Sequence, residues 1–251
     1  METRVTHVNE EESEDSGAAP YGNFINYYTF NPPENRLSLI PQTLLENIRP
    51  GSERVLMLDV GCNSGDLSVA LYKHLLQEEA PGSDLSKREV HLLGFDLDRD
   101  LILRAQNSNP FPQNVQFIPL DITDDAESRA VLGSYLGRFG CPRFQLCTCF
   151  AVTMWVHLNH GDAAFLSLLS RLASLCEFLL LEAQPWKCYR SAARRLRRLG
   201  RSDFDHFKTL KIRGDMARQA RKHLEKQCSM ELVLSFGNTA WDRSLLLFKR
   251  R

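Results

Sequence analysis

The stretch VLMLDVGCNSGDL (residues 55–67) decides the fold of this 251-residue chain. Its first residues form a short apolar run that ends on Asp59, a pattern typical of a strand buried on both faces. Gly61 and Gly65 follow, and apolar residues at helical spacing then predict a helix over Leu67–Leu76. A strand, a glycine-rich turn and a helix in this order predict the first βα unit of a parallel sheet.

The same alternation continues toward the C-terminus. Strands are expected at Val55–Asp59, Val90–Asp96, Val115–Leu120, Phe144–Val152, Phe178–Glu182, Met230–Phe236 and Ser244–Phe248. Helices are expected at Arg99–Ser108, Glu127–Arg138, Ala163–Leu175 and near Arg218–Lys226. The last two strands, with Gly237-Asn238 between them, are predicted to pair antiparallel. The predicted class is α/β: a doubly wound, mostly parallel seven-stranded sheet with an antiparallel C-terminal edge.

Composition limits the class of protein further. The chain has 31 basic and 31 acidic residues, 43% hydrophobic and 25% charged residues, which excludes collagenous, coiled-coil and wholly disordered proteins. No apolar run approaches the ~20 residues that span a bilayer, so no membrane association is expected. The N-terminal residues lack the apolar segment of a secretory signal. Seven cysteines without framework spacing are interpreted as reduced thiols in an intracellular protein. We therefore expect a monomeric protein of the cytoplasm.

Charge is segregated along the chain. Residues 1–16 hold six acids and one Arg, so residues 1–20 are predicted to be a disordered acidic tail before one domain at 21–251. Residues 187–201 carry seven positive residues and no acid. A solvated helical face is one explanation. Because ion pairs cannot form within that segment, binding of a phosphate backbone is the other.

Acidic residues collect where the predicted strands end, at Asp59, Asp96, Asp121 and Glu182. Ligands of doubly wound sheets bind beyond these strand ends. The glycine loop lacks the Gly-Lys-Ser/Thr of a phosphate loop and the middle glycine of a dinucleotide fingerprint. Acids beside the loop favour a cationic ligand. A methyl donor with a positively charged sulfonium sulfur is such a ligand. A purely structural turn with a capping Asp is the alternative.

Further segments carry a family resemblance. They are YGNFINYYTFNPPENR (21–36), DVGCNSGDLS (59–68), TMWVHLNHGD (153–162), LEAQPWKCY (181–189) and GNTAWDR (237–243). Together they resemble the bicoid-interacting RNA methyltransferase family, over nearly everything outside the acidic tail. The similarity is greatest to the branch that methylates RNA 5′-monophosphates, associated with histidine tRNA and pre-microRNA. The resemblance implies a class I, Rossmann-like methyltransferase domain and S-adenosyl-L-methionine as cofactor.

The resemblance also implies roles for single residues of the donor site. Arg36 is expected to meet the donor's carboxylate, and Asp96 with Leu97 to hold the ribose. The remaining donor-site residues lie in the glycine loop, at the adenine edge and beneath the donor: Gly61, Asn63, Gly65, Asp121, Ile122 and Phe150.

The acceptor side is expected to hold a phosphate that is already mostly a dianion at neutral pH, because its second pKa is near ~6. Catalysis then needs alignment and desolvation rather than a strong base. Neutral hydrogen-bond donors suit this task, and the candidates are Tyr28, His157, Asn159 and His160. Each has a structural alternative as a packing, capping or core residue. A metal at the HxxH pair is not expected, since no further ligand is near in sequence.

RNA contacts are predicted at Tyr27, which forms an aromatic pair with Tyr28, and along the basic segment. Lys187, Arg190, Arg194 and Arg198 share one helical face, which is a suitable track for an RNA backbone. The predicted RNA-binding set is Tyr27, Lys187, Arg190, Arg194, Arg195, Arg197 and Arg198.

One departure from the family concerns acceptor choice. Relatives that use a triphosphate carry a Lys just before the Trp, whereas this chain has Met154. The loss of that cation predicts a preference for RNA with a 5′-monophosphate. An apolar Met is also expected to narrow the space for the extra phosphates, and Met154→Lys is expected to shift the preference toward a triphosphate. Two alternatives stay open: a small-molecule methyltransferase, and a non-catalytic RNA-binding module with the methyltransferase fold.

Overall fold

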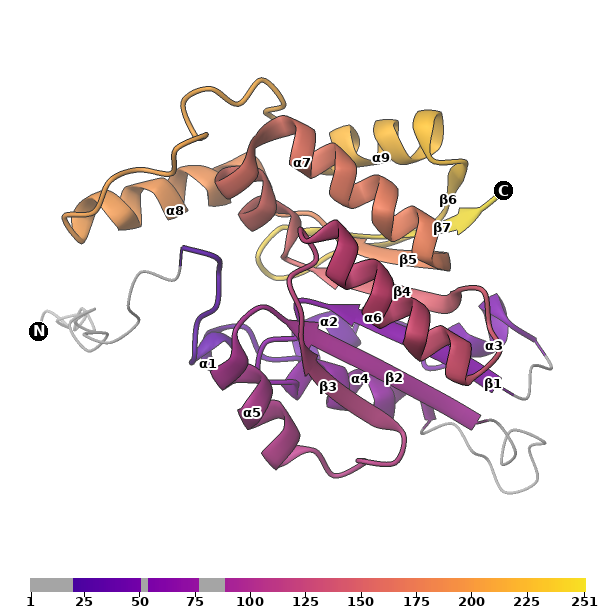
Figure 1. Cartoon of the computed structure of the whole chain (residues 1–251). Coiled ribbons are helices and arrows are strands. Elements are labelled where there is room, and N and C mark those ends of the chain that lie inside the picture. The colour runs from indigo at the N-terminus through magenta and orange to yellow at the C-terminus, as the bar shows by residue number, and fades with distance from the viewer. Residues whose placement is uncertain (1–19, 51–53, 77–88) are drawn as a thin grey trace, which may run out of the picture.

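The computed structural model describes residues 20–50, 54–76 and 89–251. Its centre is a seven-stranded sheet in the order β3-β2-β1-β4-β5-β7-β6 (Figure 1). The strands are β1 Arg54–Val60, β2 Glu89–Asp96, β3 Val115–Pro119, β4 Phe144–Phe150, β5 Cys176–Glu182, β6 Met230–Asn238 and β7 Ser244–Arg250. The predicted acidic tail lies outside the described residues, and the division at residue 20 stays a prediction. The sequence also predicts a polar loop at Glu78–Glu89, of which residues 78–88 lie outside the described residues.

The strand directions confirm the predicted fold class. Strands β1 to β5 run parallel, and β7 pairs antiparallel with both β5 and β6. Strand β1 lies between β2 and β4, so the chain winds outward in one direction and then in the other. The carboxyl ends of β1 and β4 therefore form the crevice at which doubly wound sheets bind ligands.

Helices cover both faces of this sheet (Figure 1). They are α1 Tyr27–Phe30, α2 Glu34–Leu37, α3 Leu44–Ile48, α4 Asp66–Leu76, α5 Arg99–Ser108, α6 Asp125–Arg138, α7 Thr153–Leu175, α8 Trp186–Arg198 and α9 Met216–Gln227.

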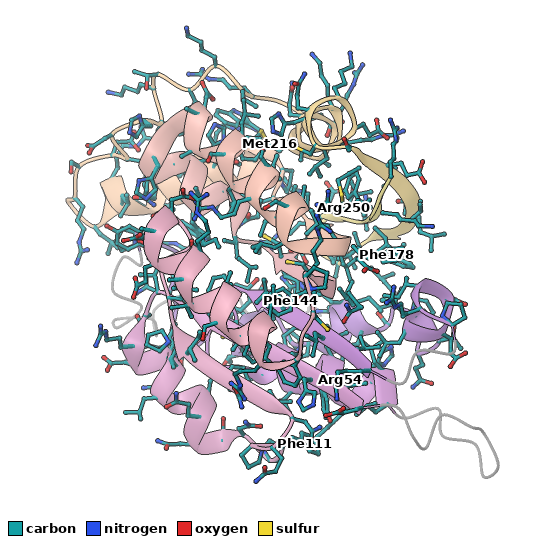
Figure 2. The ribbon with its side chains drawn as sticks, turned by 45° about the vertical axis from the view of Figure 1, so that its right-hand side comes forward. Arg54, Phe111, Phe144, Phe178, Met216 and Arg250 are labelled. Atoms are coloured by element: carbon teal, nitrogen blue, oxygen red, sulfur yellow. The ribbon has the colours of Figure 1, made fainter. Side chains whose placement is uncertain are left out.

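The core divides into two apolar clusters, one on each face of the sheet. Strand β1 shows how: Leu56 and Leu58 contribute to the cluster of α6 to α9, whereas Val55 and Met57 contribute to that of α3 to α5. Successive side chains of a strand point to opposite faces, so a strand buried on both sides must be apolar throughout. Side chains fill the space between sheet and helices on both sides (Figure 2).

Two differences between the expected and the observed element boundaries bear on the site. Strand β4 ends at Phe150 because Ala151 has a φ of 59°, which is outside strand geometry. Helix α7 begins at Thr153, ten residues before the predicted start, and bends at Gly161, whose φ is 82°. The TMWVHLNHGD segment is thus mostly helical, and the direction of each of its side chains follows from the helix.

Candidate active site

A cavity of about 310 Å³ opens at the carboxyl ends of the parallel strands. The segments after β1, β2, β3 and β4 line it, together with residues from the N-terminal segment and from the start of α7. The position is the crevice where strand order reverses. Of the predicted site residues, those that line the cavity are Tyr27, Tyr28, Arg36, Gly61, Asn63, Asp96, Leu97, Asp121, Ile122, Phe150 and His160.

The two loop glycines have different surroundings. Both have positive φ, 71° at Gly61 and 80° at Gly65, which L side chains rarely adopt. A Cβ on Gly61 would lie 2.4 Å from Cγ2 of Val152, and one on Gly65 would lie 2.7 Å from the Phe117 ring. Gly61 lines the cavity but Gly65 does not. Gly65 therefore packs against Phe117 of β3 and Ala105 of α5 and does not face the cavity.

Two acids at the strand ends are buried. Asp59 accepts hydrogen bonds from Oγ of Ser68 at 2.5 Å and Oγ1 of Thr148 at 2.6 Å. Burial outweighs these hydroxyls and raises the pKa of Asp59 to about 6. Asp96 accepts backbone N–H groups of Asn63 at 3.0 Å and Asp98 at 3.1 Å, and burial raises its pKa as well. Both carboxylates line the cavity and favour a cationic or hydroxyl-bearing ligand.

Arg36 is fully buried in an ion-pair cluster with the end of β5. Its Nε donates to Oε2 of Glu182 at 2.5 Å and its Nη2 donates to Oε1 at 3.0 Å. Nη1 of Arg243 also donates to Oε1 of Glu182, at 2.9 Å. The indole of Trp241 lies 5.0 Å from the Arg36 guanidinium and 5.6 Å from that of Arg243.

This cluster holds one more positive charge than negative. Nη1 of Arg36 and Nε of Arg243 are buried without a partner among the described residues. An uncompensated buried cation with a free N–H group is a site for an anion, because burying a charge without a partner is costly. Sequence reasoning placed Glu182 at a strand end but did not find Trp241 and Arg243 in this role, although GNTAWDR was a resemblance segment.

The paired tyrosines have different hydrogen bonds. The Tyr27 hydroxyl accepts from Nη2 of Arg36 at 2.8 Å, and no acceptor for its own hydrogen is found in the described part of the chain. The Tyr28 hydroxyl donates to the carbonyl of Cys62 at 3.2 Å, and burial raises its pKa well above 10. The free hydroxyl hydrogen belongs to Tyr27, so Tyr27 suits the donor role that was predicted for Tyr28.

The structure corrects the positions of His157 and Asn159. His157 is fully buried, its ring nitrogens lie 3.0 Å from the Tyr189 hydroxyl and 2.8 Å from Asp162, and burial lowers its pKa. Nδ2 of Asn159 donates to the carbonyls of Pro20 and Trp155, both at 2.8 Å. Neither side chain lines the cavity. Both have structural roles, whereas His160 is exposed on its rim.

Met154 is also turned away from the cavity. Its side chain is 3% exposed and belongs to the apolar cluster beneath α7 and α8. A Met that does not line the cavity cannot narrow it. The sequence argument that this residue limits the space for a triphosphate is therefore wrong in its geometry.

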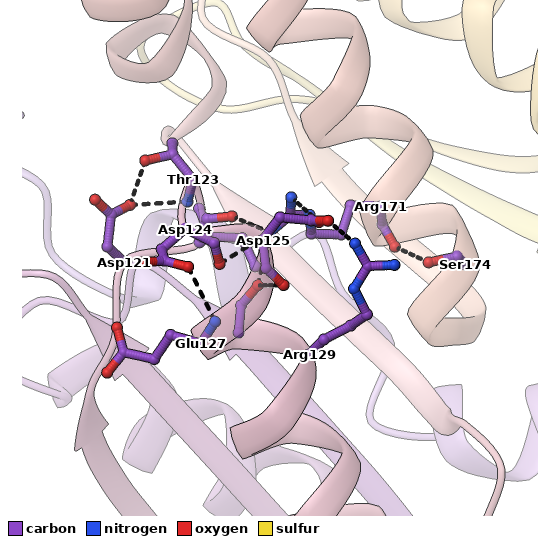
Figure 3. A network of polar contacts seen from close by, with 10 residues as sticks. Asp121, Thr123, Asp124, Asp125, Glu127, Arg129, Arg171 and Ser174 are labelled. Carbon is purple, nitrogen blue, oxygen red and sulfur yellow. Dashed lines mark hydrogen bonds and ion pairs between the residues drawn. The ribbon is translucent and has the colours of Figure 1, made fainter.

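A polar network fixes the loop after β3 (Figure 3). Asp121 accepts from both the backbone N–H and Oγ1 of Thr123, and Nη1 of Arg171 donates to the Ile122 carbonyl at 2.6 Å. Arg171 also pairs with Asp125 at the start of α6. This network holds the Asp121–Ile122 edge against the cavity.

The basic helix α8 has one buried and one charged face. Tyr189, Ala192, Ala193 and Leu196 pack inward. All six predicted cations of the helix are exposed and none lines the cavity. They are Lys187, Arg190, Arg194, Arg195, Arg197 and Arg198.

Three of these cations have partners. Lys187 pairs with Asp242 at 2.8 Å, the Arg195 guanidinium lies 4.9 Å from the Phe24 ring, and Nε of Arg197 donates to the Ala193 carbonyl. Within the described residues, no acid pairs with Arg190, Arg194 or Arg198. Of the predicted RNA-binding face, these three arginines are therefore available to contact RNA phosphates.

Sequence comparison gives the family. The sequence model described as Bicoid-interacting protein 3 (Bin3) matches residues 144–250. A zebrafish (Danio rerio) protein named Pre-miRNA 5′-monophosphate methyltransferase is 80% identical, over 100% of both chains. This chain belongs to the Bin3 family. A human RNA 5′-monophosphate methyltransferase is 52% identical, with 94% of this chain and 82% of the relative covered.

A structural comparison agrees on the fold. The bifunctional kinase-methyltransferase WbdD superposes with a TM-score of 0.51 and 17% identity, over 86% of this chain and 39% of that one. This likeness concerns the fold alone. Across the described residues, no helix is long and apolar enough to cross a membrane, and no three His, Cys, Asp or Glu side chains are grouped as metal ligands.

Proposed function

We propose that this member of the Bin3 family transfers a methyl group from S-adenosyl-L-methionine to the 5′-monophosphate of RNA. The observation that carries the proposal is the 80% identity, over the whole length of both chains, to a relative named for that reaction. The cavity at the switch point of the sheet supports it, because its charges suit such a donor.

The residues present fit S-adenosyl-L-methionine. The free Nη1 of Arg36 would hold the donor's carboxylate, the Asp59 charge would favour its cationic part, and Asp96 would accept ribose hydroxyls. Asp121 and Ile122 would border the adenine. When bound, the donor supplies an electrophilic methyl group on a positive sulfur.

The protein's own part in the reaction is to position and desolvate the phosphate. The Tyr27 hydroxyl has a free hydrogen beside the cavity, and its oxygen is fixed by Arg36. A neutral donor can orient a phosphate oxygen while leaving it nucleophilic. No base is required, since the phosphate is mostly a dianion at neutral pH.

The exposed arginines of α8 would bind the RNA body. A small acceptor does not need such a surface, which disfavours a small-molecule methyltransferase. The intact donor cavity likewise disfavours a purely RNA-binding module. Histidine tRNA and pre-microRNA remain the proposed substrates, and a monomer in the cytoplasm remains the expected setting.

The test is mass spectrometry of short RNAs after incubation with the protein and S-adenosyl-L-methionine. We expect a mass increase of one or two methyl groups on a 5′-monophosphate RNA and none on the matched 5′-hydroxyl RNA. A methylated 5′-hydroxyl RNA, or an unmodified monophosphate RNA with a protein that binds the donor, would contradict the proposal.

A further inference from the structure

The segment Pro20–Phe24, here called the N-terminal strap, is fastened across the cavity. Its two ends are held by side chains of other elements: Nδ2 of Asn159 donates to the Pro20 carbonyl at 2.8 Å, and Nδ2 of Asn63 donates to the Phe24 carbonyl at 3.1 Å. Between them, Gly22 lies so close to the Trp155 indole that a Cβ would be 2.2 Å from Nε1. The strap residues Gly22 and Asn23 line the cavity.

The amide orientation of Asn23 follows from its partner. Nδ2 donates to Oδ2 of Asp98 at 2.7 Å, and Oδ1 of the same carboxylate accepts the backbone N–H groups of Asp100 and Leu101 at the start of α5. A carboxylate engaged in this way acts as an acceptor, so the NH₂ group of Asn23 must face it.

The other end of the amide therefore presents an acceptor. Oδ1 of Asn23 is buried and accepts no hydrogen bond from the described residues. Buried polar atoms are normally hydrogen-bonded, and one left alone in a native fold calls for an explanation. Because the side chain lines the cavity, a ligand is the natural partner.

We propose that Oδ1 of Asn23 accepts a hydrogen bond from the adenosyl part of the methyl donor. The inference rests on the proposed function. It assigns a donor-binding role to a strap residue that the sequence analysis did not single out.

Position favours the adenosyl part over the amino-acid part. Asn23 is tied to Asp98, whose backbone N–H binds Asp96 at the end of β2. Arg36 and its free N–H are tied to Glu182 at the end of β5. Strands β1 and β4 separate β2 from β5, so the ends of β2 and β5 are about 14 Å apart at the usual strand spacing. The hydrogen comes from a ribose hydroxyl or from the adenine amino group.

The test is calorimetric binding of ligands to the full chain and to Asn23→Ala, without turnover. The ligands are S-adenosylhomocysteine, 5′-methylthioadenosine, which lacks the amino-acid part, and two analogues of S-adenosylhomocysteine, one without a ribose hydroxyl and one without the adenine amino group. Asn159→Ala is the matched control, because it loosens the strap without removing a cavity-lining group. Thermal unfolding without ligand checks that each variant folds.

We expect Asn23→Ala to raise the Kd of S-adenosylhomocysteine about three- to tenfold, as for one lost hydrogen bond. The same factor should appear with 5′-methylthioadenosine. The factor should fall to about one for the analogue that lacks the hydrogen accepted by Oδ1. That analogue shows whether a ribose hydroxyl or the adenine amino group donates to Asn23. Asn159→Ala should change the Kd of all four ligands by one common factor.

Two results would overturn the inference. One is that Asn23→Ala raises the Kd of all four ligands by the same factor. The other is that Asn23→Ala leaves the Kd of 5′-methylthioadenosine unchanged. Both presuppose that the unmodified chain binds S-adenosylhomocysteine. If the unmodified chain binds none of the four ligands, the proposed function fails as well, so the two failures are distinguishable.

Discussion

At the residue scale, the ionisation of Asp59 affects both the stability of the fold and the proposed binding of the donor. Its carboxylate is 3% exposed, and burial raises its pKa from 3.8 to about 6. A raised folded-state pKa means that the contribution of Asp59 to stability is fully present below pH ~4 and is lost as the pH rises through about 6. At neutral pH, ionisation of this buried group lowers the free energy of unfolding by roughly 3 kcal/mol. A cationic ligand beside it would offset part of that cost.

We therefore predict that affinity for S-adenosyl-L-methionine rises with pH across the pKa of Asp59. At pH 5 the carboxylate is mostly protonated, and the Kd should be about tenfold higher than at pH 7. Calorimetry between pH 5 and 7.5 measures this. Asp59→Asn should bind weakly throughout and lose most of the slope, leaving the smaller part due to Asp96. An equal slope in that variant would exclude Asp59 as the titrating group.

Met154 gives a prediction that reverses the sequence-based one. Because its side chain packs in the core, Met154→Lys should destabilise the protein by about 3 kcal/mol or more through burial of a charge. It should not convert the enzyme to triphosphate RNA. Met154→Leu, which nearly conserves volume, should cost less than about 1.5 kcal/mol. Denaturant unfolding and competition between mono- and triphosphorylated RNAs test this, and a stable Lys variant with triphosphate preference would restore the sequence argument.

At the scale of elements, helix α7 shows where sequence reasoning reaches its limit. The strand ends were predicted within a few residues because buried parallel strands are continuous apolar runs, and the acids that follow them must meet at one edge of the sheet. For residues 153–162 the helix itself was not predicted, since Gly161 interrupts the pattern. Without the helix, nothing in the sequence indicates that Trp155 and His160 face the cavity while Met154 and His157 face the core.

Helix α8 gives a prediction about RNA binding. Arg190, Arg194 and Arg198 are exposed and lack acidic partners within the described structure, so their joint replacement by Gln should weaken RNA binding and lower its dependence on salt. Three phosphate contacts correspond to a change of about two to three in the slope of log K against log salt. Donor affinity should stay unchanged, because α8 does not line the cavity.

The matched control for this variant removes three exposed cations from another helix. Arg218, Lys222 and Lys226 lie on α9, which is far from α8 in the fold (Figure 1) and contributes no residue to the cavity. Their replacement by Gln changes the net charge equally but should leave the salt slope nearly as it is. Equal effects of the two triple variants would mean that RNA binding depends on total charge rather than on α8.

At the scale of the whole molecule, the site joins segments that lie far apart in the sequence. The strap and Arg36 come from the first 36 residues, the strand-end loops from the middle, and Arg243 from the turn between β6 and β7. The sequence indicated most single members of this assembly. It could not show that Arg36, Glu182 and Arg243 meet. Residues 182 and 243 come together only when β5 and β7 pair in the sheet, and the Arg36 side chain reaches Glu182 from helix α2.

A site assembled from the whole chain predicts that donor binding stabilises the whole fold. Unfolding separates every group that contacts the ligand, so the unfolded chain has no affinity for it. S-adenosylhomocysteine at 100 times its Kd should then stabilise the native state by about 2.7 kcal/mol. For a protein of this length, that corresponds to a rise in Tm of roughly 5 to 10 °C in one cooperative transition.

ATP is the discriminating control for this thermal shift, since it shares the adenosine but brings polyphosphate to a cavity lined by Asp59 and Asp96. We expect ATP at the same concentration to change Tm by less than about 1 °C, because repulsion between like charges opposes its binding. Differential scanning calorimetry gives both values. An equal shift with ATP would mean that the cavity selects adenosine alone, and that its buried acids do not contribute to the choice of a cationic donor.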